Sequence, residues 1–220
     1  MSRFFLQKSP AGLVLTDSVS GQKPLLIDFA SGAVKHRVRQ GGKKELLLKA
    51  IGSKKSLRIL DCTAGLGMDA FLMAFAGHRV VMTERSVVLA ALLEDALQRG
   101  AEDEFSRAAV SRMTLLKGDA ADALAKPGFH PDVIYIDQMF PARRKSAEVK
   151  GEMQMLQRFL GHDGEVGALL AQAARLRPGK IVVKRPAQDE AYTDMTPDHV
   201  YMAKANRFDV FVFSQKSGLP

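Results

Sequence analysis

Residues 57–69 read Leu-Arg-Ile-Leu-Asp-Cys-Thr-Ala-Gly-Leu-Gly-Met-Asp, a short apolar run that ends at an acid and continues into a loop with two glycines. The apolar run has the length and composition of a buried strand. Gly65 and Gly67 let the backbone turn tightly and approach a ligand that any Cβ would exclude. A helical pattern follows over residues 69–76. The stretch therefore predicts a strand, a ligand-approaching loop and a helix in direct succession.

Strand and helix patterns alternate along the rest of the chain. Helical patterns cover residues 86–99, 147–160 and 165–176, and the further apolar runs are Val80–Met82, Met113–Leu116, Val133–Ile136 and Ile181–Val183. This alternation predicts right-handed βαβ crossovers and an α/β fold with a mostly parallel, doubly wound sheet. Val200–Met202 and Phe208–Phe213 predict a closing antiparallel hairpin at the C-terminal end of the sheet.

The amino-terminal part has a different pattern. Residues 13–15 and 25–29 are two β-like runs separated by the turn signal Ser-Gly-Gln-Lys-Pro at 20–24, which predicts a small antiparallel lead-in. We expect a basic loop with Gly41 and Gly42 to follow, and then a helix from Lys43 to about Ile51. Residues 1–50 are therefore expected to pack on a main domain of residues 51–220.

Length and composition exclude several classes of protein. A chain of 220 residues suits one domain, or one domain with a small appendage. The single cysteine, Cys62, excludes an internal disulfide and a cysteine zinc cage, and the five scattered histidines lead us to expect no metal. No apolar stretch approaches transmembrane length, and the amino-terminal apolar run is too short for a signal peptide. We therefore expect a soluble, cytoplasmic protein.

The charge balance points to a polyanionic partner. Lysine and arginine total 32 against 24 acids, which gives a net charge of +8 and a pI near 9.7. Any single basic cluster is more often a solvated face, but several clusters beside candidate ligand loops favour a phosphate backbone, and hence nucleic acid, as partner. The residues expected to contact it are Lys35, Arg37, Arg39, Lys43, Lys44, Arg143, Arg144, Lys145, Lys184 and Arg185.

Acids follow four successive strand patterns. Asp61 is placed to take up the ammonium group of an amino-acid moiety, and Glu84, about 20 residues on, to accept both hydroxyls of an adenosine ribose. Asp119 occupies the usual place for recognition of an adenine amine, and Asp137 ends the fourth run. Any one of these acids could be a helix N-cap or a turn residue. Four at successive strand ends favour a ligand site.

The fourth run, Val-Ile-Tyr-Ile-Asp-Gln-Met-Phe-Pro at 133–141, brings an acid and an aromatic ring to the same edge. A carboxylate at Asp137 beside the ring of Phe140 suits a flat base with an exocyclic amine, because the ring stacks on the base while acceptors hold its N–H groups. The plainer interpretation is a buried strand that ends in a turn, with Phe140 simply packed.

A nicotinamide oxidoreductase is an alternative, because Gly65-x-Gly67-x-x-Ala70 fits the loose dinucleotide-binding fingerprint. Two observations weigh against it. Asp61 would repel a pyrophosphate, and no Tyr/Lys pair or histidine is placed as a hydride-transfer acid.

Six longer motifs extend over nearly the whole chain: DFASGAVKHR at 28–37, DCTAGLGMDAF at 61–71, ERSVVLAALLED at 84–95, DQMFP at 137–141, KSAEVKGEM at 145–153 and VVKRP at 182–186. Through them the chain resembles the bacterial small-subunit rRNA guanine-N2 methyltransferases of the RsmJ type, a branch of the class I S-adenosylmethionine-dependent methyltransferases. The resemblance implies a Rossmann-like class I methyltransferase fold and S-adenosylmethionine as cofactor. It also implies transfer of a methyl group to the exocyclic N2 of a guanine in 16S ribosomal RNA.

The resemblance also implies which residues contact the cofactor: Met68, Asp69, Glu84, Arg85, Asp119, Ala120 and Asp137. The family usually has proline where this chain has Gln138, and the loop around Asp119 and Ala120 also differs in residue type. Gln138 keeps the main-chain carbonyl but lacks the φ restriction of proline, so we expect a looser loop.

In the expected mechanism, the guanine stacks on Phe140, and its 2-amino group donates to the Asp137 carboxylate and the Gln138 main-chain carbonyl. Alignment and fixed dipoles then supply most of the acceleration. Two further alternatives stay open. One is an amino-methyltransferase acting on another RNA or on DNA, and the other is a basic nucleic-acid-binding protein with a vestigial cofactor pocket.

Overall fold

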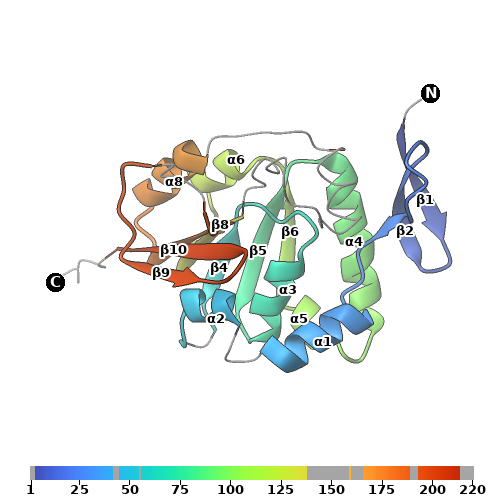
Figure 1. Cartoon of the computed structure of the whole chain (residues 1–220), viewed down its shortest axis with the longest axis horizontal. Coiled ribbons are helices and arrows are strands. Elements are labelled where there is room, and N and C mark those ends of the chain that lie inside the picture. The colour runs from blue at the N-terminus through green and yellow to red at the C-terminus, as the bar shows by residue number, and fades with distance from the viewer. Residues whose placement is uncertain are drawn as a thin grey trace.

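The computed structural model describes residues 3–41, 45–54, 56–137, 159, 166–188 and 193–213. A seven-stranded sheet runs through the centre of this part of the chain (Figure 1). Its strand order is β6 (Met113–Lys117), β5 (Arg79–Glu84), β4 (Arg58–Asp61), β7 (Val133–Ile136), β8 (Lys180–Pro186), β10 (Asn206–Val212) and β9 (His199–Met202).

The first five of these strands are parallel, and β10 pairs antiparallel with both β8 and β9. From the central strand β4 the chain first builds outward through β5 and β6, and then returns to add β7 and β8 on the other side. The order therefore reverses between β4 and β7, and ligands of open α/β sheets bind beyond the carboxyl ends of the strands at such a point. The expected doubly wound sheet with a closing antiparallel hairpin is confirmed.

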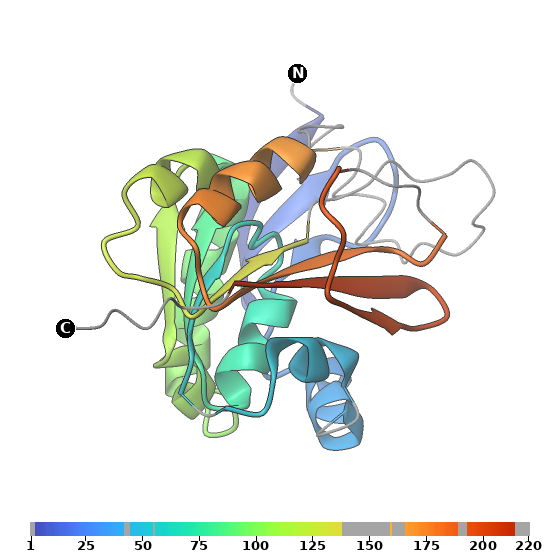
Figure 2. The same cartoon turned by 90° about the vertical axis from the view of Figure 1, so that its left-hand side faces the viewer.

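Helices cover both faces of the sheet (Figure 2). One face carries the shorter layer of α6 (Ala120–Ala125) and α8 (Val166–Arg175), and the other carries α2 (Leu46–Ile51), α3 (Met68–Phe75), α4 (Val87–Glu102) and α5 (Arg107–Val110). Each layer encloses its own cluster of buried apolar side chains.

Strand β7 shows why the parallel strands appear in the sequence as continuous apolar runs. Val133 and Tyr135 belong to the core on the α3–α4 side, whereas Ile134 and Ile136 belong to the core on the α6–α8 side. Successive side chains of a strand point to opposite faces, so a strand covered on both faces favours apolar residues at every position. All four residues are at most 1% exposed.

The amino-terminal segment forms a separate three-stranded antiparallel sheet of β1 (Phe4–Ser9), β2 (Gly12–Asp17) and β3 (Leu25–Leu26). The expected lead-in is therefore confirmed, with β1 as an additional strand. Leu15 and Leu25 join the core on the α3–α4 side, and Arg99 Nη2 of α4 donates a 2.6 Å hydrogen bond to the Ile27 carbonyl. These contacts attach the small sheet to α4.

The basic segment before Gly41 is a helix, α1 (Gly32–Gly41), and the expectation of a loop is wrong. The Val34 N–H donates to Ser31 Oγ at 3.3 Å, which caps the first turn, and Val34 and Val38 both pack against the core. Side chains four residues apart share one face of a helix, so two valines suffice to anchor an otherwise polar segment. The next helix, α2, begins at Leu46.

The predicted helix over 147–160 lies almost entirely outside the described residues. Within the described part, none of the helices combines the length and the apolar character that crossing a membrane requires.

Candidate active site

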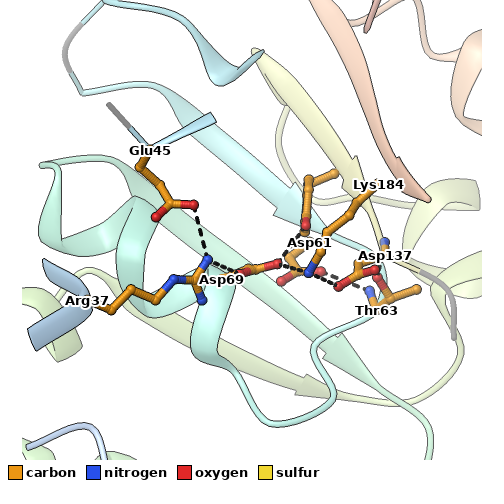
Figure 3. Close-up of polar contacts among 8 residues, drawn as sticks. Arg37, Glu45, Asp61, Thr63, Asp69, Asp137 and Lys184 are labelled. Carbon is orange, nitrogen blue, oxygen red and sulfur yellow. Dashed lines mark hydrogen bonds and ion pairs between the residues drawn. The ribbon is translucent and has the colours of Figure 1, made fainter. Parts of the chain in front are cut away.

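Four charged side chains meet at the switch point between β4 and β7 (Figure 3). Asp61 ends β4, Asp137 directly follows β7, Lys184 lies near the carboxyl end of β8, and Asp69 lies in the first turn of α3. Lys184 Nζ is 2.7 Å from Asp69 Oδ2 and 2.7 Å from Asp137 Oδ2. One ammonium group therefore bridges two carboxylates that come from separate βα units.

Asp69 is also held from two other directions. The Tyr135 hydroxyl of β7 donates to Asp69 Oδ2 at 2.7 Å, and Arg37 Nη2 of α1 donates to Asp69 Oδ1 at 3.1 Å. The same Arg37 nitrogen donates to Glu45 Oε1 at 3.2 Å (Figure 3). A continuous chain of charges thus runs from Glu45 through Arg37, Asp69 and Lys184 to Asp137, and it links α1 to the edge of the sheet.

The backbone of Asp137 is fixed by the glycine loop. Its N–H donates to Thr63 Oγ1 at 2.6 Å, and the Thr63 N–H in turn donates to Asp61 Oδ1 at 2.9 Å. Asp137 and the loop after β4 therefore hold each other in place. Since the Asp137 side chain remains one-third exposed, its carboxylate can still meet a ligand.

The glycine loop depends on its two glycines for different reasons. Gly65 and Gly67 have φ angles of 54° and 69°, in the left-handed region that favours glycine. A Cβ on Gly67 would lie 2.8 Å from Leu93 Cδ2 and 3.1 Å from Phe29 Cζ, so the packing of these side chains leaves no room for a larger residue at this position. A Cβ on Gly65 would have no neighbour closer than 3.8 Å, which leaves that side of the loop open.

Glu84 at the end of β5 supports the same loop. Its Oε2 accepts from the Gly65 N–H at 3.0 Å, and its Oε1 accepts from the Ser86 N–H at 2.8 Å. The Arg85 N–H also contributes a hydrogen bond to this carboxylate, which has about four lone-pair sites and so keeps capacity for a further donor. Burial raises the pKa of Glu84 above its usual value, although the N–H groups of Ser86, Gly65 and Arg85 and the charge of Arg85 favour the ionised form.

The carboxylates at the switch point differ in their acidity. Burial opposes ionisation of Asp69, but the charges of Lys184 and Arg37 outweigh it and lower the pKa of Asp69 to about 2. Burial raises the pKa of Asp137 to about 6 in spite of Lys184, and the neighbouring Asp69 charge adds to the rise. Burial also raises the pKa of Asp61 to about 7. Burial alone would lower the pKa of Lys184. The charges of Asp69 and Asp137 outweigh burial, so the pKa of Lys184 is raised and its ammonium group stays charged.

The structure places the four predicted acids at the carboxyl ends of four adjacent strands, β6, β5, β4 and β7, and it gives two of them a part in holding the local backbone. Asp61 is only 1% exposed and accepts from the Thr63 N–H, so it shapes the loop and is not positioned to contact a ligand ammonium group directly. Asp119 is the N-cap of α6, with Oδ1 accepting from the Ala121 N–H at 2.8 Å.

The predicted phosphate contacts from β8 need correction. Arg185 is 4% exposed and pairs with Asp209 of β10 at 3.3 Å, so its contact with nucleic acid is excluded. Lys184 is committed to Asp69 and Asp137, and its predicted role as a phosphate ligand gives way to a role inside the site. Seven other predicted residues lie outside the described part of the chain, namely Lys43, Lys44, Gln138, Phe140, Arg143, Arg144 and Lys145.

Sequence reasoning missed Lys184, Tyr135 and Thr63 as members of the site. Lys184 offered a signal, because a lysine within a buried parallel strand needs a carboxylate partner to offset its desolvation. Tyr135 offered a weaker one, since a buried phenol usually finds a hydrogen-bond acceptor.

Comparison with known proteins shows to which family the chain belongs. The family described as putative SAM-dependent methyltransferase matches residues 1–213. The chain belongs to this methyltransferase family. A relative named ribosomal RNA small subunit methyltransferase J, from Tolumonas auensis, is 44% identical over 196 residues, which are 87% of this chain and 79% of the relative. A relative of the same name from Ectopseudomonas mendocina is 43% identical over 216 residues, with 94% and 82% covered.

A solved structure of a SAM-dependent methyltransferase from Neisseria gonorrhoeae is similar to the methyltransferase described here over 99% of this chain and 84% of its own, with a TM-score of 0.75 and 29% identity. The chain is therefore an S-adenosylmethionine-dependent enzyme with a Rossmann-like fold. The residues at the switch point fit the cofactor. The open side of Gly65 admits close approach of a ligand to the backbone, and Glu84 keeps acceptor capacity suited to ribose hydroxyls.

The other residues that the family resemblance implies as cofactor contacts also lie at the carboxyl edge of the sheet. Met68 and Asp69 form the first turn of α3, Arg85 follows β5, and Ala120 begins α6 after Asp119. Among the described residues, no group of three or more histidine, cysteine, aspartate or glutamate side chains is arranged to hold a metal ion.

Proposed function

We propose that the enzyme transfers the methyl group of S-adenosylmethionine to the exocyclic N2 of a guanine in 16S ribosomal RNA, in the cytoplasm. The printed names of the relatives at 43–46% identity support the small-subunit rRNA as substrate. The choice of N2 rests on the motif resemblance and on one observation: a partly exposed carboxylate, Asp137, lies at the switch point, fixed by both backbone and side-chain contacts.

Asp137 acts as the acceptor for the target amine. Its main chain is held by Thr63 and its Oδ2 by Lys184, so the carboxylate has a fixed direction before the base arrives. A 2-amino group that donates to this carboxylate is oriented with its nitrogen lone pair free to react. Such a fixed acceptor needs no reorganisation during the reaction, which is the main source of electrostatic catalysis.

Gln138 and Phe140 complete the acceptor site in this proposal. The Gln138 main-chain carbonyl takes the second N–H of the amine, and the Phe140 ring stacks on the guanine. The target guanine has to be unpaired or flipped, because its amine is otherwise engaged in base pairing.

When bound, S-adenosylmethionine supplies an already activated methyl group on its sulfonium. Gly65 and Gly67 would let the loop backbone come close to it, Glu84 would accept from the ribose hydroxyls, and Asp119, besides capping α6, would accept from the adenine amine. Asp69 and Met68 would contact it from the first turn of α3. The excess of carboxylates at the switch point suits a cofactor that carries a sulfonium and an ammonium charge.

Lys184 controls the charge of Asp137. Without a cation between them, Asp69 and Asp137 could not both stay ionised at short range. With Nζ 2.7 Å from each, the ammonium keeps Asp137 able to accept hydrogen bonds near neutral pH. We therefore assign Lys184 as a positioning residue that acts through Asp137.

The half-buried Lys35 and the exposed Arg39 of α1, together with Lys43, Lys44 and Arg143–Lys145, contact the phosphates around the target base in this proposal. Arg37 lies on the same helix but is partly engaged by Asp69 and Glu45. Counterion release from several phosphates makes RNA binding strongly salt-dependent.

The test replaces Asp137 by asparagine, which keeps the shape and removes the charge. We expect methyl transfer to 16S rRNA to fall by at least about a hundredfold, as for loss of a preorganised electrostatic group. Binding of RNA should be nearly unchanged. Near-normal turnover in this variant would overturn the mechanism. Methyl transfer to DNA in preference to rRNA would show that the proposed substrate is wrong.

A further inference from the structure

A cavity of about 510 Å³ lies at the opposite edge of the sheet, where β4, β5 and β6 begin. Three arginines line it, Arg58, Arg79 and Arg112, together with the hydroxyl-bearing Ser56 and Thr114. None of these residues belongs to the active site at the carboxyl edge.

The strand register brings the three arginines into one row. Arg58 and Arg79 are direct register partners at the starts of β4 and β5. Arg112 directly precedes β6, and its carbonyl accepts from the Val80 N–H at 2.9 Å, which places it beside the start of β5. Neighbouring strands lie about 4.8 Å apart, and like charges in adjacent positions are unfavourable.

Among the described residues, acids compensate only one of these charges. Arg58 lies 3.6 Å from Asp132 Oδ2. Arg112 Nη1 donates to the carbonyls of Ala74 and Ala108 instead, and in the described part of the chain neither Arg79 nor Arg112 forms an ion pair. The cavity therefore keeps a surplus of positive charge.

The chemistry of the lining fits a phosphate group. Guanidinium groups bind phosphate through paired N–H donors, and Thr114 and Ser56 add hydroxyl donors beside them. We propose that this cavity binds a backbone phosphate of the substrate RNA, as a second contact away from the methyl-transfer site. This inference rests on the proposed rRNA substrate. The β5 strand that separates the two sites is six residues long, about 20 Å, a distance that folded RNA can span.

The experiment uses Arg79→Gln, because Arg79 is exposed and its side chain has no partner in the described part of the chain that a substitution would disrupt. The matched control is Arg175→Gln, which removes the same charge from the end of α8, outside the cavity. Binding of a protein-free 16S rRNA transcript is measured at several salt concentrations, alongside methyl transfer at saturating RNA and thermal unfolding.

We expect Arg79→Gln to weaken RNA binding by roughly tenfold and to reduce the slope of log affinity against log salt by about one. The control, turnover at saturating RNA and thermal unfolding should be unchanged. Equal RNA binding by Arg79→Gln and the wild type would overturn the inference while leaving the proposed function intact.

Two other results are informative. Stabilisation of the wild type by inorganic phosphate alone, lost in Arg79→Gln without any effect on RNA binding, would identify a small-anion site and overturn the RNA contact. If the wild type itself fails to bind the transcript, the proposed rRNA substrate is wrong, and this inference is overturned with it.

Discussion

Replacing Lys184 by methionine tests how the site controls the charge of its acceptor carboxylate. The substitution keeps an unbranched chain of similar length and removes the ammonium that lies 2.7 Å from both Asp69 and Asp137. Two unit charges about 4 Å apart interact by about 4 kcal/mol at an effective dielectric constant of about 20, or about three pKa units. Because the Lys184 and Asp137 side chains are 21% and 33% exposed, solvent screening reduces this effect to about one or two units.

The consequence for activity follows from the sign of that shift. Asp137 has a pKa of about 6 with Lys184 in place, so most of it is ionised at neutral pH. Without the ammonium, its pKa rises to about 7 or 8, and the ionised fraction at pH 7 falls by about two- to tenfold. Single-turnover methyl transfer should fall by the same factor and recover as the pH rises toward about 9.

The assay is the pH profile of single-turnover transfer at saturating RNA and S-adenosylmethionine. Lys180→Met is the matched control, because Lys180 lies on the same strand, donates only to the Ala50 carbonyl at 3.5 Å and forms no ion pair in the described part of the chain. An unshifted pH profile in Lys184→Met would show that Lys184 does not control the charge of Asp137. A rate that stays low at every pH would show that Lys184 acts in some other way than through the charge of Asp137.

Further expectations concern the cofactor loop and the wild-type pH profile. Gly67→Ala should destabilise the protein by about 1–3 kcal/mol, because its Cβ would meet Leu93 and Phe29. Gly128→Ala, with a similar φ of 67° and no atom within 4 Å, should cost less in thermal unfolding, and equal losses would contradict the packing argument. Glu84→Gln should weaken S-adenosylmethionine binding by roughly tenfold in calorimetry, since it loses a charged acceptor. An unchanged affinity would remove Glu84 from the cofactor site. Wild-type transfer should rise between about pH 5 and 7 as Asp137 ionises, and a flat rate over that range would contradict its role as acceptor.

The sheet could be predicted because four of its five parallel strands, β4, β5, β7 and β8, are largely buried on both faces. Such strands require continuous apolar runs, and each of the five runs expected from the sequence overlaps a strand of the structure. The glycine loop was also visible, because positive φ angles at two nearby positions are met most readily by glycine. The acids at the strand ends could also be predicted, because each of them follows one of these apolar runs.

The features that could not be predicted depend on contacts between distant segments. Helix α1 contains mainly polar and basic residues, and only its packing through Val34 and Val38 reveals which face is buried. Asp61 and Asp69 flank the same loop, yet one is a buried loop support and the other is bridged by Lys184 from β8. Sequence spacing alone cannot distinguish two such acids, because the difference lies in a partner more than a hundred residues away.

The most direct test of the central claim is to locate the transferred methyl group. Small-subunit rRNA from cells that lack this protein is incubated with the enzyme and labelled S-adenosylmethionine, digested to nucleosides and mapped. We expect label in N2-methylguanosine at a single nucleotide, and its loss with Asp137→Asn. Label on another atom or another base, or no label although the cofactor binds, would contradict it.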